Sequence, residues 1–270
     1  MSYELTVHPN AVARFDLSGR TVWVVGGAGL LGAPVCCALA EHGAHVIISD
    51  LREDRGRSLA RDLNSAGLSA EAEALDVADE AAIVELTDKI VSRRGCVDVL
   101  VNMTYFYTMT EMDRMTTHEW ERGLHVTLTG AFILGREGGR VMKCKGGSII
   151  QFSSMYGLVS PDPRIYPPRH KVNPIDYGVA KAGILQMVRY QAVMLAPYKV
   201  RVNAIVPGPF PDAESQGADP DFVRKLEDKC PLGRVGRPQE IVGAVVYLAS
   251  DASEYVTGTR IVVDGGWTAW

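Results

Sequence analysis

The sequence predicts an α/β protein built on one doubly wound parallel sheet with helices on both faces. Seven short runs rich in β-branched residues alternate with amphipathic runs of helical length along the 270 residues. Each parallel connection needs a crossover, usually a helix, so this alternation predicts a parallel sheet. A glycine-rich turn at residues 26–32 also separates the first strand from the first helix, as is common in doubly wound sheets.

The expected strands are recognised by their β-branched and apolar residues. They are residues 21–25, 44–49, 70–75, 97–102, 146–154, 200–208 and 259–266. The helical patterns between them cover residues 30–43, a stretch through Leu59 and Leu63 to Gly67, and residues 79–95, 119–143, 176–196 and 238–250. Asp79 is placed to cap the third helix, and Pro238 opens the last one at the position that proline prefers. We expect one domain over residues 1–270, because no linker or repeat interrupts the alternation.

Composition excludes several classes of protein. Apolar residues make up 47% and charged residues 22% of the chain, which is typical of a globular protein and not of a disordered or collagen-like one. No apolar run reaches 18 residues, and the first 19 residues lack the pattern of a secretory signal, so we expect no membrane association. With 28 basic and 32 acidic side chains, the net charge of −4 argues against a nucleic-acid partner. The five cysteines have unpatterned spacings, which favours reduced thiols in the cytoplasm and no metal site.

The glycine-rich turn reads Gly26-Gly27-Ala28-Gly29-Leu30-Leu31-Gly32. Glycines at such a turn let the backbone bend sharply and let a pyrophosphate approach the N-terminus of the following helix. An ordinary strand–helix turn is the alternative. Its position after the first strand favours binding of a dinucleotide.

Asp50 ends the second strand, 24 residues after Gly26. A carboxylate there accepts hydrogen bonds from the adenosine ribose and repels a 2′-phosphate, which favours NAD over NADP. A helix cap or a solvated aspartate is the alternative interpretation. Arg52 keeps NADP open, because an arginine nearby can hold the phosphate.

Tyr177 and Lys181 lie four residues apart on a strongly helical stretch, so they share a face. A phenol with a pKa near 10 is a weak base at neutral pH, and a nearby ammonium lowers that pKa. The pair could equally be two exposed helix residues. Its coincidence with the glycine turn points to catalysis.

The motifs together resemble the short-chain dehydrogenase/reductase family over residues 17–270. The elements in the family's order are the glycine turn, Asp50, Asp76-Val77, DVLVN at 98–102, SIIQFSS at 148–154, Tyr177-Gly-Val-Ala-Lys181, RVNAIVPG at 201–208 and VVDGG at 262–266. The resemblance implies a Rossmann fold and hydride transfer between a nicotinamide and a carbonyl or alcohol. The ending VVDGGWTAW and the segment YGLVSPDPRIYP further resemble bacterial members linked to sugar-acid and flagellin-glycan metabolism.

Carried over residue by residue, the resemblance makes Ser154 the serine that polarises the substrate oxygen, with Ser153 the less favoured choice. Tyr177 becomes the general acid/base, and Lys181 lowers its pKa and holds the nicotinamide ribose. The implied cofactor-binding residues are Gly26, Gly29, Leu30, Leu31, Gly32, Asp50, Leu51, Asp76, Val77, Asn102, Met103, Thr104, Tyr177, Lys181, Pro207, Gly208 and Phe210.

Five features depart from the family pattern. Val25 replaces the threonine before the first glycine, and the glycines follow a GxxGxxG spacing. Met103-Thr104-Tyr105 replaces Asn-Ala-Gly after the fourth strand. Thr127 falls where the family has a helix asparagine that carries a relay water, which leaves Thr127 as a possible relay residue. Ser154 and Tyr177 are 23 residues apart, a longer gap than the family usually has.

Two segments, residues 155–176 and 207–237, are expected to form the substrate site. Residues 161–176 hold five of the fourteen prolines together with Arg164, Arg169, His170 and Lys171. Because arginine can clamp a carboxylate, we expect an anionic, sugar-like substrate with contacts from Tyr105, Tyr156, Arg164 and Arg169. Solvated surface cations are the alternative.

The leading hypothesis is therefore an NAD-dependent oxidoreductase acting on a secondary alcohol or ketone. An NADP-dependent reductase is the first alternative. A cofactor-binding sensor or scaffold with little catalysis is the second. The helix at 176–196 carries apolar residues beyond one face, and the tail at 265–270 is apolar, so we expect a homotetramer, as in much of the resembled family.

Overall fold

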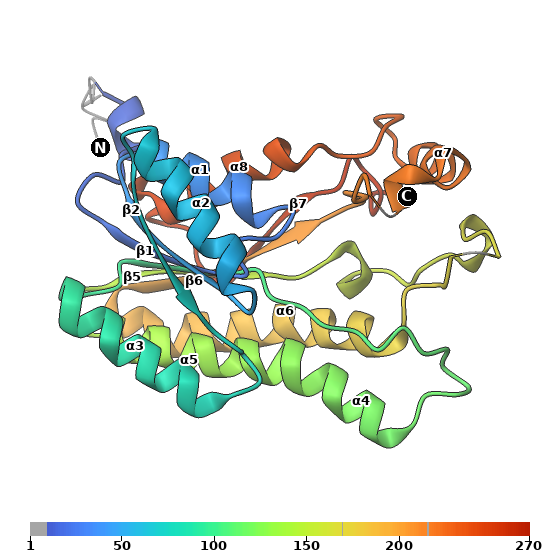
Figure 1. Ribbon diagram of the computed structural model, residues 1–270, viewed down its shortest axis with the longest axis horizontal. Helices are drawn as coiled ribbons and strands as arrows, with labels where there is room; N and C mark the ends of the chain where they lie inside the picture. The colour runs from blue at the N-terminus through green and yellow to red at the C-terminus, as the bar shows by residue number, and fades with distance from the viewer. Residues whose placement is uncertain (1–9, 169, 215) are drawn as a thin grey trace, which may run out of the picture.

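The computed structural model describes residues 10–168, 170–214 and 216–270, and its centre is one seven-stranded parallel sheet (Figure 1). The strand order is β3-β2-β1-β4-β5-β6-β7. The strands are β1 (Thr21–Val25), β2 (His45–Asp50), β3 (Ser69–Ala74), β4 (Val99–Asn102), β5 (Gly147–Phe152), β6 (Val200–Pro207) and β7 (Arg260–Val263). The predicted doubly wound α/β fold is confirmed.

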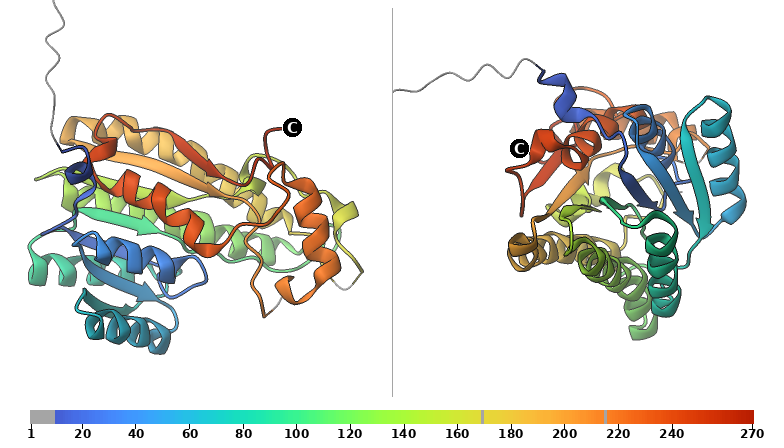
Figure 2. Two further views of the ribbon diagram at one scale, coloured as in Figure 1. Left: turned by 90° about the horizontal axis from the view of Figure 1, so that it is seen from above. Right: turned by 90° about the vertical axis from the view of Figure 1, so that its left-hand side faces the viewer.

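Helices cover both faces of this sheet, as the right-hand view of Figure 2 shows. On one face lie α1 (Gly32–Glu41), α2 (Glu53–Ser65) and α8 (Val242–Ala249). On the other lie α3 (Glu80–Arg94), α4 (Thr117–Leu124), α5 (Gly130–Met142) and α6 (Ile175–Leu195). None of the helices in the described part of the chain is long and apolar enough to cross a membrane.

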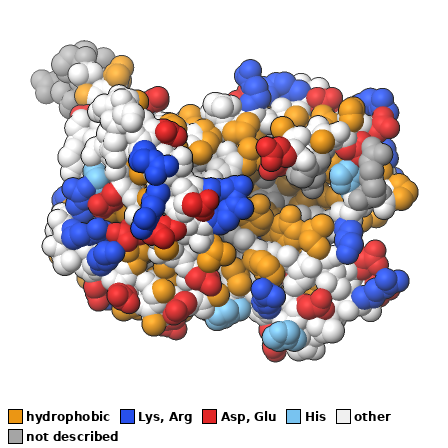
Figure 3. Space-filling view, viewed as in Figure 1, with side chains coloured by type: hydrophobic (Ala, Val, Ile, Leu, Met, Phe, Trp, Pro, Cys, Tyr) orange, Lys and Arg blue, Asp and Glu red, His pale blue; other side chains and the backbone are white. Residues whose placement is uncertain are grey.

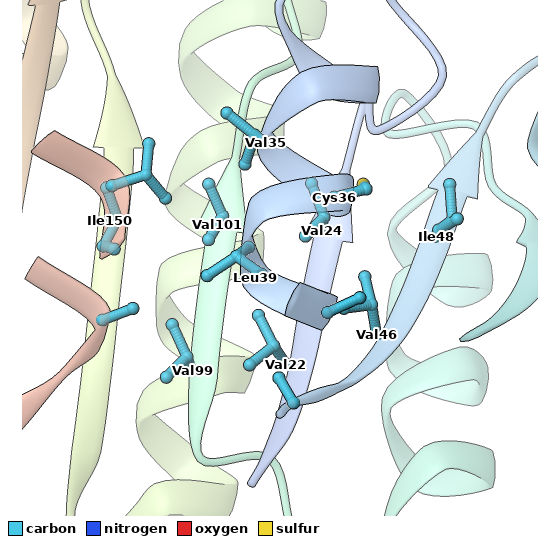
Figure 4. Close-up of a cluster of buried hydrophobic side chains, with 14 of the residues drawn as sticks. Val22, Val24, Val35, Cys36, Leu39, Val46, Ile48, Val99, Val101 and Ile150 are labelled. Atoms are coloured by element: carbon cyan, nitrogen blue, oxygen red, sulfur yellow. The ribbon is translucent and has the colours of Figure 1, made fainter. Parts of the chain in front are cut away.

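Alternate residues of the central strands enter two separate cores. Val22 and Val24 of β1 point to the α1 face, where Val35 and Leu39 cover them (Figure 4). Trp23, between them, belongs to the core on the opposite face. Successive side chains of a strand point to opposite faces, so a strand buried on both sides reads as a continuous apolar run.

Local signals placed most helix ends correctly. The Asp79 carboxylate accepts a hydrogen bond from the Ala82 amide at 3.1 Å and caps α3, as predicted. Pro238 opens a 3-10 turn, Pro238–Ile241, that leads into α8. The helix expected at 119–143 is interrupted by a π-helical turn, His125–Thr129, between α4 and α5.

The segment at 207–237, expected to form part of the substrate site, contains a helix that the sequence patterns did not predict, α7 (Pro220–Lys229). Its N-terminus is capped by the Asp219 side chain, which accepts hydrogen bonds from the Asp221 and Phe222 amides. Proline follows the cap at the first helical position. α7 lies beyond the carboxyl ends of the strands, beside the segment around residues 161–168 (Figure 1).

Candidate active site

A cavity of about 290 Å³ opens at the carboxyl ends of β1, β4, β5 and β6. This edge of an open parallel sheet is where ligands bind. Hydrophobic side chains gather in a hollow on the face shown in Figure 3. Predicted site residues that line the cavity are Gly26, Gly29, Leu30, Leu31, Gly32, Met103, Tyr105, Ser154, Tyr156, Tyr177, Lys181, Pro207, Gly208 and Phe210.

Ser154, Tyr177 and Lys181 come together on one wall of this cavity. Tyr177 and Lys181 lie one turn apart near the start of α6, and Ser154 follows β5. The Ser154 hydroxyl hydrogen-bonds to the Tyr177 phenol. The Ser153 hydroxyl instead donates to the Lys181 backbone oxygen at 2.7 Å, which supports Ser154 as the serine that faces a substrate.

The Lys181 ammonium is buried and bonded to backbone. It donates to the Phe152 carbonyl oxygen at 2.8 Å and to the Thr104 carbonyl oxygen at 3.2 Å. Burial lowers the pKa of Lys181 to about 7.

Burial has the opposite effect on the phenol, raising the pKa of Tyr177 to about 12, while the Ser154 hydrogen bond acts to lower it. The hydrogen bonds of the lysine go to two backbone carbonyls, and its ammonium is desolvated. The role of Lys181 in lowering the pKa of Tyr177 stays a prediction.

The glycine turn fits a nucleotide pyrophosphate. Gly26 has φ +79°, and a side chain there would bring a Cβ within 3.2 Å of the Met103 carbonyl carbon. At Gly32 a Cβ would lie 2.4 Å from the Gly26 oxygen. No side chain of the described residues caps the N-terminus of α1 at Leu31, and both Leu31 and Gly32 line the cavity. An uncapped helix start of this kind is suited to an anion.

Asp50 braces the same turn. Its carboxylate accepts hydrogen bonds from the Ala28 amide at 3.2 Å and from the Arg52 amide at 3.1 Å. Leu51 beside it is exposed, and Asp76 accepts a hydrogen bond from the Ala78 amide at 2.9 Å. These residues and the buried Val77 lie outside the lining of the cavity, at the strand ends on the β2–β3 side of the glycine turn.

Asn102 shapes the loop after β4 from inside the fold. Its amide nitrogen donates to the Gln151 side chain at 2.8 Å. Its amide oxygen accepts hydrogen bonds from the Thr104 amide at 3.1 Å and hydroxyl at 2.7 Å. The buried Asn102 thus holds the Thr104 carbonyl that accepts from Lys181.

Thr127 is fully buried in the π-helical turn and uses its hydroxyl on one peptide. The hydroxyl donates to the Phe106 oxygen at 2.8 Å and accepts from the Phe106 amide at 2.8 Å. Its hydrogen is therefore donated within the fold, and a role for Thr127 in a proton relay stays a prediction. Thr127 positions the 105–107 segment instead.

Three tyrosines, Tyr105, Tyr107 and Tyr177, pack together in the wall of the cavity. Tyr105 and Tyr107 are stacked with ring centres 5.8 Å apart, and each meets Tyr177 edge-on, at 6.1 and 5.7 Å. In another part of the lining, the Tyr156 and Tyr166 hydroxyls share a hydrogen bond of 2.6 Å.

The cavity is also lined by residues that were not among the predicted site residues, including Tyr107, Tyr166, Phe222 and Leu226. Phe222 and Leu226 are four residues apart, a spacing that places both on one face of a helix, and this was the signal available for the last two.

The position of Arg164 does not support its expected role in binding an anion in the cavity. Its side chain is 85% exposed, forms two hydrogen bonds of 2.8 Å to Asp162, and does not line the cavity. Arg169 lies outside the described residues. Lys171, from the same loop, does line the cavity. Across the described ranges no group of three or more His, Cys, Asp or Glu side chains could hold a metal ion.

Comparison with known proteins decides the family. The family model described as enoyl-(acyl carrier protein) reductase matches residues 28–268. Trans-4-hydroxycyclohexanecarboxylate dehydrogenase of Sinomonas cyclohexanicum is 35% identical over 256 residues, covering 93% of each chain. The chain belongs to the short-chain dehydrogenase/reductase family. It is thus an oxidoreductase that uses a nicotinamide cofactor on an alcohol or ketone.

Solved structures of this family agree closely with the chain. Gluconate 5-dehydrogenase from Burkholderia cenocepacia J2315, in complex with NADP and tartrate, superposes with a TM-score of 0.86 at 28% identity, covering 95% of this chain and 98% of that one. A short-chain dehydrogenase from Leptospira borgpetersenii with bound NAD⁺ gives a TM-score of 0.81 at 31% identity, covering 94% of each.

Two departures from the short-chain dehydrogenase/reductase sequence pattern leave the local backbone structure in place. Thr127 stands in place of the asparagine, yet the helix still opens into a π-turn at this residue. In the glycine turn, a Cβ would make tight contacts at Gly26, Gly27 and Gly32, whereas a Cβ at Gly29 would make an ordinary contact of 3.5 Å. Among the three glycines of the GxxGxxG spacing, the first and the last therefore meet the steric requirement.

Proposed function

We propose that the enzyme oxidises a secondary alcohol of a hydroxycarboxylic acid, with NAD as the preferred cofactor. The observation that carries the proposal is the meeting of Ser154, Tyr177 and Lys181 on a cavity wall that continues to the uncapped start of α1. A hydroxy acid is supported by the names of two similar proteins, which act on 4-hydroxycyclohexanecarboxylate and on gluconate. The aromatic rings in the cavity wall suit a compact ring better than an extended chain.

In this proposal each side chain has one task. Ser154 donates a hydrogen bond to the substrate oxygen and holds it beside Tyr177. Tyr177, as the phenolate, removes the hydroxyl proton during oxidation and returns it during reduction. Lys181, whose ammonium lies at the Phe152 and Thr104 carbonyl oxygens, would hold the cofactor ribose. A bound nicotinamide supplies the hydride acceptor or donor.

The preference for NAD rests on Asp50. Its carboxylate lies beside the glycine turn, where a 2′-phosphate would bring like charges together. Similar proteins are known with NADP and with NAD⁺, so family membership leaves the choice to local residues. Arg52, whose amide bonds to Asp50, is the residue that would favour NADP instead.

The experiment is a turnover assay of the purified chain with NAD⁺ and with NADP⁺ on a panel of hydroxy acids and matched neutral alcohols. We expect oxidation of cyclic or sugar hydroxy acids, followed at 340 nm. Binding of NAD⁺ without turnover of any alcohol, and of any matching ketone with NADH, would contradict an enzymatic function and favour a sensor or scaffold.

We further propose that the enzyme is a homotetramer. Val193 and Tyr190 on α6 are 73% and 66% exposed in the single chain, and Phe132 on the adjacent α5 is also exposed. A second copy would bury these apolar side chains. Trp267 of the tail is already buried against its own chain, so only Trp270 is free for an interface. A monomeric mass by light scattering would contradict this proposal.

The unpatterned cysteines support a cytoplasmic location.

A further inference from the structure

Apart from Lys181, the lining of the cavity contains one lysine or arginine among the described residues, Lys171. It lies on the loop that connects Ser154 to Tyr177, so it enters the cavity from the substrate side and not from the glycine turn. Its ammonium donates to the Met109 carbonyl oxygen at 2.9 Å. Two of its three hydrogens remain available to a ligand.

Lys171 differs from the neighbouring cations in having no carboxylate partner among the described residues. Arg164 and Lys229 both pair with Asp162, at 2.8 and 2.7 Å. The His170 ring contacts Asp219 at 2.8 Å and stacks on Phe222. Arg164 and Lys229 thus share one carboxylate partner, whereas Lys171 has none among the described residues and lines the cavity.

The wall beside Lys171 contains a second unused polar group. The side-chain oxygen of Asn173 is buried and has no hydrogen-bond partner, although Asn173 lines the same cavity. A buried acceptor without a partner costs free energy unless a ligand supplies the donor. A substrate hydroxyl is such a donor. This wall thus offers a cation and an acceptor, surrounded by the aromatic rings of Tyr156 and Tyr166.

We propose that Lys171 binds the carboxylate of the substrate and so sets the preference for hydroxy acids over neutral alcohols. The inference rests on the proposed function, since it places the reacting hydroxyl at Ser154 and Tyr177 and the carboxylate at the opposite wall. Lys171 is exposed, and a charge-assisted hydrogen bond from its ammonium is stronger than a neutral one, so it favours an acid over the neutral analogue.

Binding of a compound that cannot react tests this without depending on turnover. The probes are cyclohexanecarboxylate and its uncharged analogue cyclohexanecarboxamide, titrated into the full chain with saturating NAD⁺ by calorimetry. We expect the wild type to bind the carboxylate about 10-fold or more tightly than the amide. Lys171→Met should remove that ratio by weakening the carboxylate alone, and Lys171→Arg should retain most of it.

Lys229→Met is the matched control, because it removes the same charge from the same region but outside the cavity, and it should leave the ratio unchanged. No preference for the carboxylate in the wild type would overturn the inference. Equally weaker binding of both probes to Lys171→Met would also overturn it, because it would show that Lys171 acts only through its hydrogen bond to the Met109 carbonyl. Loss of the ratio in Lys229→Met would also overturn it. Preference for the carboxylate without turnover of any hydroxy acid would overturn the proposed function and leave Lys171 as the anion site.

Discussion

The Lys181 ammonium nitrogen lies 5.6 Å from the centre of the Tyr177 ring, one turn further along α6, and its hydrogen bonds go to the Phe152 and Thr104 carbonyls. Burial raises the pKa of Tyr177 to about 12 and lowers that of Lys181 to about 7. Both shifts favour the neutral forms. We therefore expect the proton chemistry of the site to depend on pH.

Alcohol oxidation should accelerate as pH rises. The phenolate of Tyr177 is the base, and its pKa is raised, so the reactive form grows up to tenfold for each pH unit below that pKa. We expect kcat/KM for oxidation to increase from pH 6 to pH 10 and that for reduction to stay level or fall. A flat oxidation profile over this range would show that Tyr177 is not the base.

Lys181→Met should abolish efficient turnover and yet stabilise the fold at neutral pH. Because the pKa of Lys181 falls from 10.5 in the unfolded chain to about 7 in the fold, the unfolded state binds more protons between these values. The free-energy cost of burying the charge of the wild-type lysine is absent above pH 10.5, grows as pH falls to about 7, and stays constant below that pH. Thermal melts should show the advantage of Lys181→Met growing from pH 10 to pH 7. An advantage that does not change with pH would contradict a depressed pKa.

Thr127→Val should loosen the aromatic wall. The substitution leaves the amide and carbonyl of Phe106 without their partner, which costs about 1–3 kcal/mol for buried groups. We expect a lower melting temperature and a smaller loss of kcat than in Tyr177→Phe. Thr127→Ser keeps the hydroxyl and is the control. If Thr127→Val melts like the wild type, the contact with Phe106 does not support the segment.

Asp50→Asn should narrow the preference for NAD. Asparagine keeps an acceptor for the Ala28 amide but removes the charge that repels a 2′-phosphate. We expect the ratio of kcat/KM for NAD⁺ over NADP⁺ to fall by about tenfold or more. Equal kcat/KM for both cofactors in the wild type would contradict the role given to Asp50.

Sequence periodicity predicted the sheet and most helices because both signals are local. Strands buried on both faces, such as Thr21–Val25, read as apolar runs, and Asp79 marked a helix start by its own side chain. The short α7 was missed because its two core contacts, Phe222 and Leu226, lie in a charged stretch that reads as loop. The family motif also placed Ser154, Tyr177 and Lys181 on one wall.

The substrate side could not be predicted to the same depth. Which cation of the 161–176 loop lines the cavity depends in part on contacts between residues distant in sequence. Asp162 pairs with the nearby Arg164 and also with Lys229 on α7, while the Lys171 ammonium donates to the Met109 carbonyl. The effect of burial on Lys181 likewise depends on the whole fold and not on its spacing from Tyr177.

The central claim is that Tyr177 performs the proton transfer of a nicotinamide-dependent dehydrogenase. The most direct measurement compares kcat of the wild type, Tyr177→Phe and Tyr107→Phe on one hydroxy acid, with the Kd for NAD⁺ measured in parallel. We expect Tyr177→Phe to lower kcat by about 10²–10⁴-fold with an unchanged Kd, and Tyr107→Phe, from the same ring cluster, to lose far less. A wild-type kcat in Tyr177→Phe would contradict the account.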